Sequence, residues 1–438
     1  MRPLLLFLIP GSLALAQQTL PLSLKRAVEI ALTPEGSPRI ALAQETIKQA
    51  ETHVTQARSA FLPTIDATVQ ERNATTNLAT FGFNFQLPFG FTIPSFVGPY
   101  TVFDARGSIQ QSVFSFSDIR KYQATRVSLA ATKADADTTR NQVSEQVARA
   151  YLACLRADAA QDTAQANVDL SVALERLANS QKTAGTGTGI EVTRSQVQLA
   201  NDRQRLIVAQ KDRRRAVMEL LRAMGLNLDA NVAFTDKLAF IPVEVGTLEA
   251  SLDKARQERS ELQAQHQREQ AARLSLGSVA AERLPSVSAF GDYGSTGLQI
   301  DSARPTRQYG IEVKVPVFDG FRRESRRAES ATQYRQEKIR LRDLEQQVEL
   351  EVREALDSLR SAQAELEAAR DGLMLAENEL AQAQRRYQAG VTNSIEVTDA
   401  QTRLDRARDN QIAALYDYNL ARIDLATGTG TIGEYVNQ

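Results

Sequence analysis

The stretch Ala184-Gly185-Thr186-Gly187-Thr188-Gly189-Ile190-Glu191-Val192-Thr193 returns 205 residues later as Ala389-Gly390-Val391-Thr392-Asn393-Ser394-Ile395-Glu396-Val397-Thr398. Both copies follow a long run of helix-forming residues, and the register between them continues without a gap to Ala209 and Ala414. Upstream, Leu62-Pro63 returns as Leu284-Pro285. Because the landmarks recur in the same order, the chain is a tandem duplication, and one half is its unit of architecture.

The composition of the 438-residue chain narrows the classes of function. The formal net charge is −1, so a nucleic-acid partner is not indicated. The only cysteine, Cys154, cannot form an internal disulfide, and the two histidines cannot build a histidine-rich metal site. We therefore expect no metal and no cofactor. We expect Cys154 to be a small buried hydrophobic residue rather than a reactive thiol.

Residues 1–16 have the order of parts found in a signal peptide. Arg2 supplies a positive start, an apolar stretch follows, and Ala14-Leu15-Ala16 fits a cleavage site, so the mature chain is expected to begin near Gln17. An N-terminal membrane anchor is the alternative, but Pro10-Gly11 interrupts the stretch, which is short for a spanning helix. No later segment offers a spanning helix, so we expect any membrane crossing to use strands.

Long helices are predicted where proline is absent, because an interior proline costs a helix about 3 kcal/mol. No proline occurs between Pro99 and Pro242 or after Pro316, and these regions are rich in Ala, Leu, Glu, Gln and Arg. Each half is predicted to contain a helix, two strands, a long helix, a glycine-bearing tip and a shorter helix. The predicted helices span residues 24–60, 118–183, 191–224, 248–282, 321–388 and 396–425.

The long helix of the second half carries a seven-residue repeat of apolar side chains. The repeat consists of Val352, Leu359, Leu366, Leu373, Leu380 and Tyr387, with Ala355, Ala362, Ala369, Ala376 and Ala383 at the alternate positions. A strict heptad predicts a left-handed supercoil, and the alanines let a partner helix come close. At 1.5 Å per residue the helix would be about 100 Å long. That length suits a structure that crosses a wide aqueous space.

Four segments alternate between apolar and polar residues. They span residues 62–73, 101–114, 284–294 and 307–318. In the last segment, one face carries Tyr309, Ile311, Val313, Val315 and Val317. The alternation fits strands of a membrane barrel and fits a half-buried soluble sheet equally well. Because four strands cannot close a barrel, a membrane location would require several chains to share one barrel of 8, 12 or 16 strands.

A phenylalanine-rich link joins the first two strands. A dense aromatic set of this kind would be an aggregation liability in a soluble protein, whereas at a membrane it would anchor the interface or cap a pore mouth. The expected membrane-interface aromatics are Phe81, Phe83, Phe85, Phe89 and Phe91.

The landmarks divide the chain into five parts. These are the signal peptide (1–16), a first repeat (17–225), an inter-repeat segment (226–247), a second repeat (248–426) and a C-terminal tail (427–438). The tips between helices span residues 184–190 and 389–395. We expect the inter-repeat segment and the tail to form an equatorial collar around the helices.

Together these features resemble the TolC family of outer-membrane efflux proteins. The resemblance rests on the duplicated halves, the Leu-Pro strand starts, the Val113-Phe114 and Val317-Phe318 strand ends, and the tip that runs from Arg386-Tyr387 to Ile395-Glu396-Val397. It implies a mostly α-helical fold with a small β part, in which a homotrimer forms a helical tunnel in the periplasm and a shared 12-stranded outer-membrane β-barrel. It also implies a passive exit duct whose partners are a periplasmic adaptor (membrane fusion) protein, an inner-membrane transporter and outer-membrane lipid.

By the same resemblance, Glu396 and Asp399 match acidic positions that ring the closed periplasmic aperture. Residues three apart on a helix share a face, although the helix dipole alone also favours acids in a first turn. Tyr387 matches a tyrosine that latches the closed state, and Glu191 matches its acidic partner. A packing role at the end of the heptad is equally consistent for Tyr387. Thr392 stands where some members carry an arginine, so we expect a weaker or differently built latch.

The two tips are where adaptor hairpins dock in this family. The residues expected to form these docking tips are Gly185, Gly187, Gly189, Gly390, Thr392 and Ser394. Gly185 and Gly390 also fit helix C-terminal turns with a left-handed backbone. Gly187 and Gly189 exceed what a turn requires, which suggests close approach by the backbone of a partner.

An enzyme is the least supported class of function, because the sequence has no P-loop, no nucleophile elbow and no dinucleotide fingerprint. A periplasmic coiled-coil adaptor or structural scaffold is the main alternative to a duct, since it too uses long helical hairpins. It would not explain the amphipathic strands. The cargo stays open between drugs, metal ions and secreted polypeptides, and the absence of His and Met clusters argues against a dedicated soft-metal duct.

Overall fold

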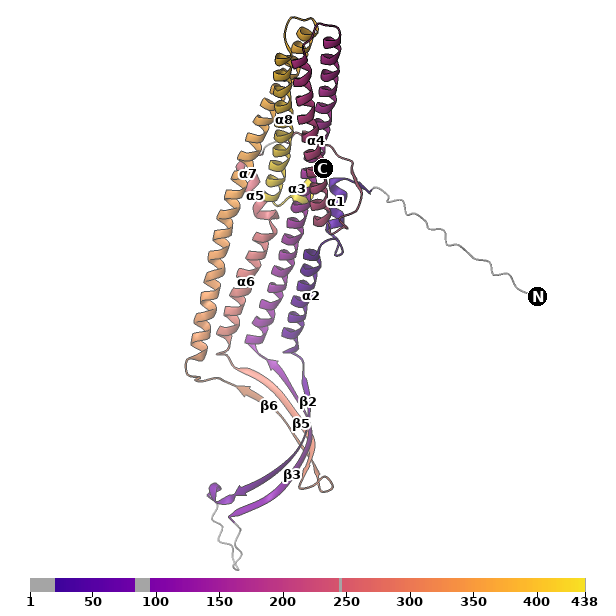
Figure 1. Cartoon of the computed structure of the whole chain (residues 1–438). Coiled ribbons are helices and arrows are strands. Elements are labelled where there is room, and N and C mark those ends of the chain that lie inside the picture. The colour runs from indigo at the N-terminus through magenta and orange to yellow at the C-terminus, as the bar shows by residue number, and fades with distance from the viewer. Residues whose placement is uncertain (1–19, 83–94, 244–245, 438) are drawn as a thin grey trace, which may run out of the picture. The chain divides into compact units, whose positions relative to one another are not determined.

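The computed structural model describes residues 20–82, 95–243 and 246–437. It contains two compact units (Figure 1). The helical unit comprises Met1–Thr46, Lys133–Gln263 and Arg342–Gln438, and the strand-bearing unit comprises Ile47–Thr132 and Ala264–Leu341. The predicted signal peptide and the expected interface residues Phe83, Phe85, Phe89 and Phe91 lie outside the described residues, as does the side chain of Phe81.

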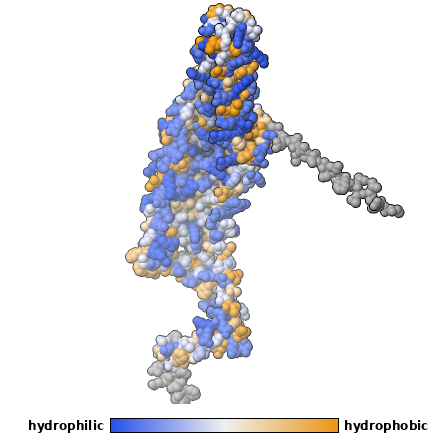
Figure 2. Space-filling model, viewed as in Figure 1, coloured by the Kyte–Doolittle hydropathy of each residue, from blue (hydrophilic) through white to orange (hydrophobic). Residues whose placement is uncertain are grey.

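Two helical hairpins build the helical unit, which includes α3 from Lys133 onward and α7 from Arg342 onward. The first joins α3 (Phe116–Thr183) to α4 (Gly189–Ala223), and the second joins α7 (Arg322–Gln388) to α8 (Ser394–Gly428). The heptad prediction is confirmed, because Leu359 and Leu366 are each 1% exposed and pack against α8 residues that include Tyr418. Nearer the tip, Leu380 and Tyr387 form a second cluster with Leu404 of α8. Hydrophilic residues cover most of the visible surface of these helices (Figure 2).

The helix predicted over residues 24–60 is wrong as a single element. The chain forms α1 (Leu24–Ala31) and α2 (Pro38–Ser59). The break contains Pro34 and Gly36, and Pro38 is the first residue of α2. Proline both removes a backbone donor and disfavours helix at the residue before it. The break was therefore readable from the sequence.

The helix predicted over residues 248–282 is also interrupted, forming α5 (Leu248–Glu258) and α6 (Ser260–Ala281). Contacts with residues far away in the sequence cause this interruption. Arg259 adopts an extended backbone between the two helices, and its side chain, 8% exposed, forms ion pairs with Glu351 and Glu261. Gly430 lies against the break so closely that a Cβ would come within 2.9 Å of the Arg259 nitrogen.

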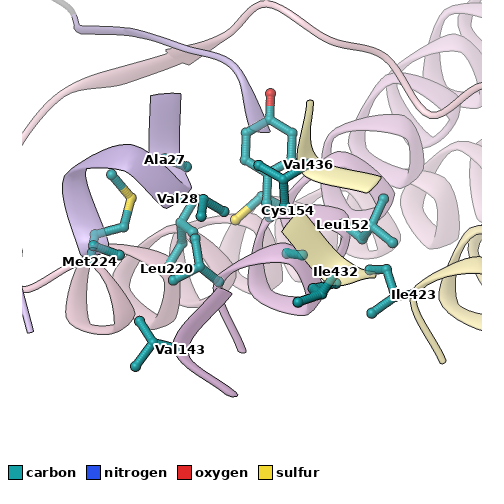
Figure 3. Packing of buried hydrophobic residues seen from close by; sticks show 14 of the residues in the cluster. Ala27, Val28, Val143, Leu152, Cys154, Leu220, Met224, Ile423, Ile432 and Val436 are labelled. Carbon is teal, nitrogen blue, oxygen red and sulfur yellow. The ribbon is translucent and has the colours of Figure 1, made fainter. Parts of the chain in front are cut away.

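The inter-repeat segment and the C-terminal tail share one core with the start of the chain. Strand β1 (Leu20–Leu22) pairs in parallel with β4 (Val232–Phe234), and α9 (Ile432–Val436) packs into the same cluster. The Tyr151 hydroxyl lies 2.8 Å from the Asp236 carboxylate, which also accepts from the Leu24 nitrogen. Cys154 is fully buried in this core (Figure 3), and burial raises the pKa of its thiol to about 12. The expectation that Cys154 is a packing residue is confirmed.

Replacing Gly225 by alanine is expected to destabilise the helical unit by roughly 2–4 kcal/mol. Gly225 has φ +68°, and a Cβ there would lie 1.9 Å from the Gly36 carbonyl oxygen, so backbone must move. Gly372→Ala is the matched control, because its Cβ meets nothing within 4 Å inside α7. That control should raise stability by about 0.5–1 kcal/mol. Thermal unfolding of both variants checks the pair, and a harmless Gly225→Ala would contradict the packing described.

The strand-bearing unit holds a four-stranded antiparallel sheet in the order β2-β3-β5-β6. The strands are β2 (Thr64–Asn77), β3 (Phe96–Phe114), β5 (Ser286–Gly297) and β6 (Arg304–Lys314). The predicted end at residue 318 is therefore too late, and Val315 and Val317 lie beyond β6. No helix in the described part of the chain is both long enough and apolar enough to cross a membrane.

The register of the sheet gives it two different faces. Ile65 lies opposite Ile109, which lies opposite Gly291, which in turn lies opposite Tyr309, so these residues share one face. On the same face, Ile311 is 74% exposed. The other face carries an ion-paired cluster in which Arg106 contacts Asp104 at 2.8 Å and Asp292 at 3.3 Å. The predicted alternation of apolar and polar faces is confirmed.

Candidate aperture and docking tips

The first tip is a helix C-terminal turn followed by a capped helix start. Gly185 has φ +75°, and the Thr186 nitrogen donates to the Gln181 carbonyl at 2.9 Å, as in a Schellman turn. Helix α4 then begins with a capping interaction, because the Thr188 nitrogen donates to a Glu191 carboxylate oxygen at 2.9 Å. Glu191 therefore has a local structural task in addition to any role at an aperture.

The three glycines of the first tip are not equivalent. A Cβ on Gly187 would lie 3.0 Å from the Gln181 Cβ and 3.1 Å from the Lys182 nitrogen, so the turn itself favours glycine there. The tight turn is therefore a second reason for glycine at position 187, and a docking role for Gly187 stays a prediction. At Gly189, a Cβ would meet nothing within 4 Å. Among these glycines, Gly189 alone combines an ordinary helical backbone with open space.

The second tip repeats the turn with different side chains. Gly390 has φ +69°, and the Val391 nitrogen donates to the Arg386 carbonyl at 3.0 Å. Asn393 caps α8 by accepting from the Ile395 nitrogen at 3.0 Å. Ser394 is the first residue of α8, and its hydroxyl oxygen is buried with no hydrogen-bond partner in the described part of the chain.

Glu396 is held by two neighbours within its own tip. Its carboxylate forms an ion pair with the Arg386 Nε at 3.1 Å and accepts from the Thr392 hydroxyl. Thr392 stands where some family members carry an arginine, and here Arg386 supplies a guanidinium to this tip from the end of α7. Asp399, one turn further along α8, is exposed. The two predicted aperture acids therefore differ, one being paired and the other open to solvent.

Tyr387 and Glu191 line the same small cavity, of about 30 Å³, with Ser394 and Gln401. The Tyr387 side chain is 6% exposed, and its hydroxyl has no hydrogen-bond partner within the described residues. Burial, together with the charge of Glu191, raises the pKa of Tyr387. The structure thus brings the predicted latch residues together without a hydrogen bond between them.

A buried polar network that the sequence reasoning missed lies behind this cavity. Gln401 donates to the Ser171 hydroxyl at 2.8 Å, and that hydroxyl donates to Asp202, which is 1% exposed. Arg205 joins Asp202, at 3.7 Å, to Asp405, at 3.0 Å. Two buried carboxylates therefore share one arginine. The signal available in the sequence was the aspartates themselves, which interrupt the otherwise apolar inner faces of α4 and α8.

Replacing Asp405 by asparagine is expected to raise the unfolding temperature at pH 8. Burial and the neighbouring Asp202 charge raise the pKa of Asp405, so its ionised form costs the folded state free energy. That cost disappears as the pH falls through the raised pKa. The difference in unfolding temperature between variant and parent should therefore vanish toward pH 4. Asp399→Asn, at an exposed position, should show no gap. Thermal unfolding from pH 4 to 8 measures both, and a pH-independent gap for Asp405→Asn would contradict the assignment.

Long duplicated helices, glycine tips and a short amphipathic sheet define the fold of an outer-membrane efflux channel. The chain superposes on the Campylobacter jejuni CmeC outer membrane channel with a TM-score of 0.78 and 15% identity, covering 94% of this chain and 88% of that one. For the outer membrane protein VceC from Vibrio cholerae the TM-score is 0.77 at 20% identity, covering 93% and 96%. At 15% and 20% identity, these superpositions show that the fold is shared.

The chain belongs to the family of outer membrane efflux proteins, whose model it matches over residues 30–226 and 251–431. It is 25% identical over 193 residues to outer membrane protein TolC from Vibrio cholerae serotype O1, and this alignment covers 42% of the chain and 44% of that relative. The chain is therefore an outer-membrane protein, as predicted. Membership of a family of efflux proteins favours the duct over the adaptor, scaffold or enzyme classes.

Proposed function

We propose that three copies of the chain form an exit duct that passively conducts substrates across the periplasm and the outer membrane. The observation that carries this proposal is the four-stranded sheet, whose edge strands β2 and β6 have no partner within the described chain. Open strand edges are not tolerated in hydrocarbon. Three copies joined edge to edge would close a 12-stranded barrel.

The two faces of the sheet fit opposite sides of such a barrel wall. The face that holds Ile65, Ile109 and Tyr309 suits lipid, and the face that holds the Arg106 cluster suits a water-filled interior. The phenylalanines between the first two strands, Phe81 among them, remain proposed interface anchors. The inter-repeat segment and the tail are proposed to form a collar, supported by the core they share with β1.

The closed end of the duct is proposed to lie at the two tips. Glu396 and Asp399 would ring the aperture, with Tyr387 and Glu191 as the latch between the hairpins. The ion pair between Arg386 and Glu396 would hold each copy of the second tip closed.

An adaptor protein, coupled to an inner-membrane transporter, is proposed to dock on the same tips. Apolar side chains project from both of them, since Ile190 is 57% exposed and Val391 is 70% exposed. The proposed contact residues are Gly185, Gly187, Gly189, Gly390, Thr392 and Ser394.

Replacing Gly189 by leucine tests the docking proposal. The position has open space, so the chain should fold and assemble, while export by the host cell should fall to the level of a strain that lacks the protein. Gly372→Leu is the matched control, because it is equally open but lies away from the tips within α7. Normal export by the Gly189→Leu strain would mean that the adaptor does not dock at the first tip.

A further inference from the structure

The internal repeat of the chain relates the four strands of the sheet in pairs. Strand β5 repeats β2 at an offset of 222 residues, which is the distance from Leu62 to Leu284. Strand β6 repeats β3 at an offset of 204 residues, which is the distance from Val113 to Val317. Both offsets follow from the sequence alone, so the pairing of the strands tests them independently.

The two hairpins of the sheet have the same register. Thr64 of β2 lies opposite Gln110 of β3. Their counterparts in the second repeat, Ser286 and Lys314, also lie opposite each other. The match holds for every further pair up to Thr296. The sheet therefore consists of two equivalent hairpins, and the offsets convert a residue pair of the first hairpin into a pair of the second.

One strand contact in the sheet has no counterpart within the chain. The first hairpin joins the second through β3 and β5, where Ile109 lies opposite Gly291. By the same offsets, the counterpart is a contact between β6 and β2 in which Val313 lies opposite Val69. In one chain β2 and β6 are the two edges of the sheet, with β3 and β5 between them. A second copy of the chain is therefore the partner that can supply this contact.

The second hairpin is shorter than the first at the place where that contact would lie. Strand β3 ends at Phe114, and its last residues pair with β5 as far as Val287. The corresponding residues of the second repeat, 315–318, lie beyond the end of β6 at Lys314. To continue the strand they need a neighbour in the position of β2, which their own chain does not provide. Val317 among them is 92% exposed.

We propose that β6 of one copy pairs antiparallel with β2 of the next copy, in the register that places Val313 opposite Val69, and that β6 continues to Phe318 in the assembly. The inference rests on the proposed function and adds to it the residues through which the copies join. Each copy contributes one edge of its sheet to each of its two neighbours.

This register keeps the apolar face of the sheet continuous from one copy to the next. Val69 lies on the same face of β2 as Ile65, and Val313 on the same face of β6 as Ile311. Val69 and Val313 are 73% and 60% exposed in the single chain. A shift of one residue would turn the side chains of β6 to the opposite face relative to β2, so that apolar side chains would lie beside polar ones.

Charges on the other face of the sheet fit the same register. In the chain's own β3–β5 contact, Arg106 reaches Asp292, which lies two residues before its direct partner, at 3.3 Å. In the proposed contact, the direct partner of Lys314 is Thr68 of the next copy. Asp66 of that copy lies two residues before Thr68, so Lys314 can reach it along the same diagonal. The seam between copies therefore brings opposite charges together.

Disulfide cross-linking of the purified trimer tests the register. Residues directly opposite each other in an antiparallel sheet have Cα atoms about 4.5–5.5 Å apart, within the range of about 4.4–6.8 Å that a disulfide needs. The double variant Val69→Cys with Val313→Cys should therefore join most chains into a covalent trimer after mild oxidation, measured by non-reducing denaturing electrophoresis. The bond must join two copies, because three strand spacings of about 4.8 Å separate the edges of one sheet.

Two double variants shifted by two residues along β2 are the matched controls. They combine Val313→Cys with either Ala67→Cys or Glu71→Cys, which lie on the same face but are diagonal neighbours about 7–8 Å from position 313 in the proposed register. Both should lose the covalent trimer. By contrast, Val315→Cys with Ala67→Cys should form it, because β6 extends past Lys314 in the assembly. The natural cysteine is buried and common to all variants.

The outcomes separate the register, the extension of β6 and the proposed function. Cross-linking by a shifted pair in place of positions 69 and 313, or by no pair in assembled trimers, would overturn the register. Cross-linking at positions 69 and 313 but not at 67 and 315 would overturn the extension. Native electrophoresis before oxidation shows which variants assemble, and if the first does not, the pair at 67 and 315 decides. Absence of a trimer in the parent protein would instead refute the proposed function.

Discussion

Replacement of Ile311 by arginine is expected to remove the assembled protein from the outer membrane. Ile311 is 74% exposed on the apolar face of β6, so little of the described chain covers it. A charged residue at the lipid-facing midplane of a membrane strand costs about 2–4 kcal/mol. Three copies would share one barrel, so the penalty reaches about 6–12 kcal/mol per assembly. The amount of trimer in outer-membrane fractions, measured by native electrophoresis, gives the result.

The matched control for this substitution is Gln308→Arg. Gln308 lies on the opposite face of the same strand, where it pairs in register with Asp292. An arginine there would join a face that already holds Arg106 and two aspartates, so assembly should be retained. If both substitutions abolish the trimer, or if neither does, the assignment of the two faces to lipid and water is wrong.

Arg386→Glu is expected to open the aperture. It removes the ion pair with Glu396 and places two carboxylates together at the end of α7 and the start of α8. Each exposed pair contributes at most about 1 kcal/mol, but the change occurs in three copies, so the open fraction should rise by tenfold or more. Single-channel conductance of the reconstituted protein measures this directly, and the effect should shrink at high salt because the groups are exposed.

Arg385→Glu separates this mechanism from a general change in tip charge. It makes the same substitution one residue earlier, at an exposed position that forms no ion pair with any described residue. We expect conductance close to that of the parent. If Arg385→Glu opens the channel as readily as Arg386→Glu, overall charge controls the tip, and the Arg386 pair has no special role.

Periodicity in the sequence was sufficient to predict the repeated parts of the fold. The heptad repeat of α7 could be predicted because the helix packs the same stripe of side chains inward from Val352 to Tyr387. The sheet faces were readable because side chains alternate strictly along a strand. The bulge between Ser112 and Phe114, which shifts the register of β3 against β5, was not readable from that alternation.

Features that depend on a single tertiary contact were not predictable. The helix break at Arg259 contains neither proline nor glycine, and it follows from the approach of Gly430 and the ion pair with Glu351. The engagement of Glu396 by Arg386 depends on how the turn at Gly390 folds back, which spacing along the chain does not reveal. The same holds for the shared arginine between Asp202 and Asp405, since these residues come from different helices.

The native mass of the protein extracted from outer membranes in mild detergent, with the bound detergent subtracted, tests the central claim most directly. The duct account predicts three times the mass of the mature chain, because three four-stranded sheets are needed to close the barrel. A monomer or dimer of the same extracted protein would leave the edges of β2 and β6 unpaired and would contradict the shared barrel on which the proposed function depends.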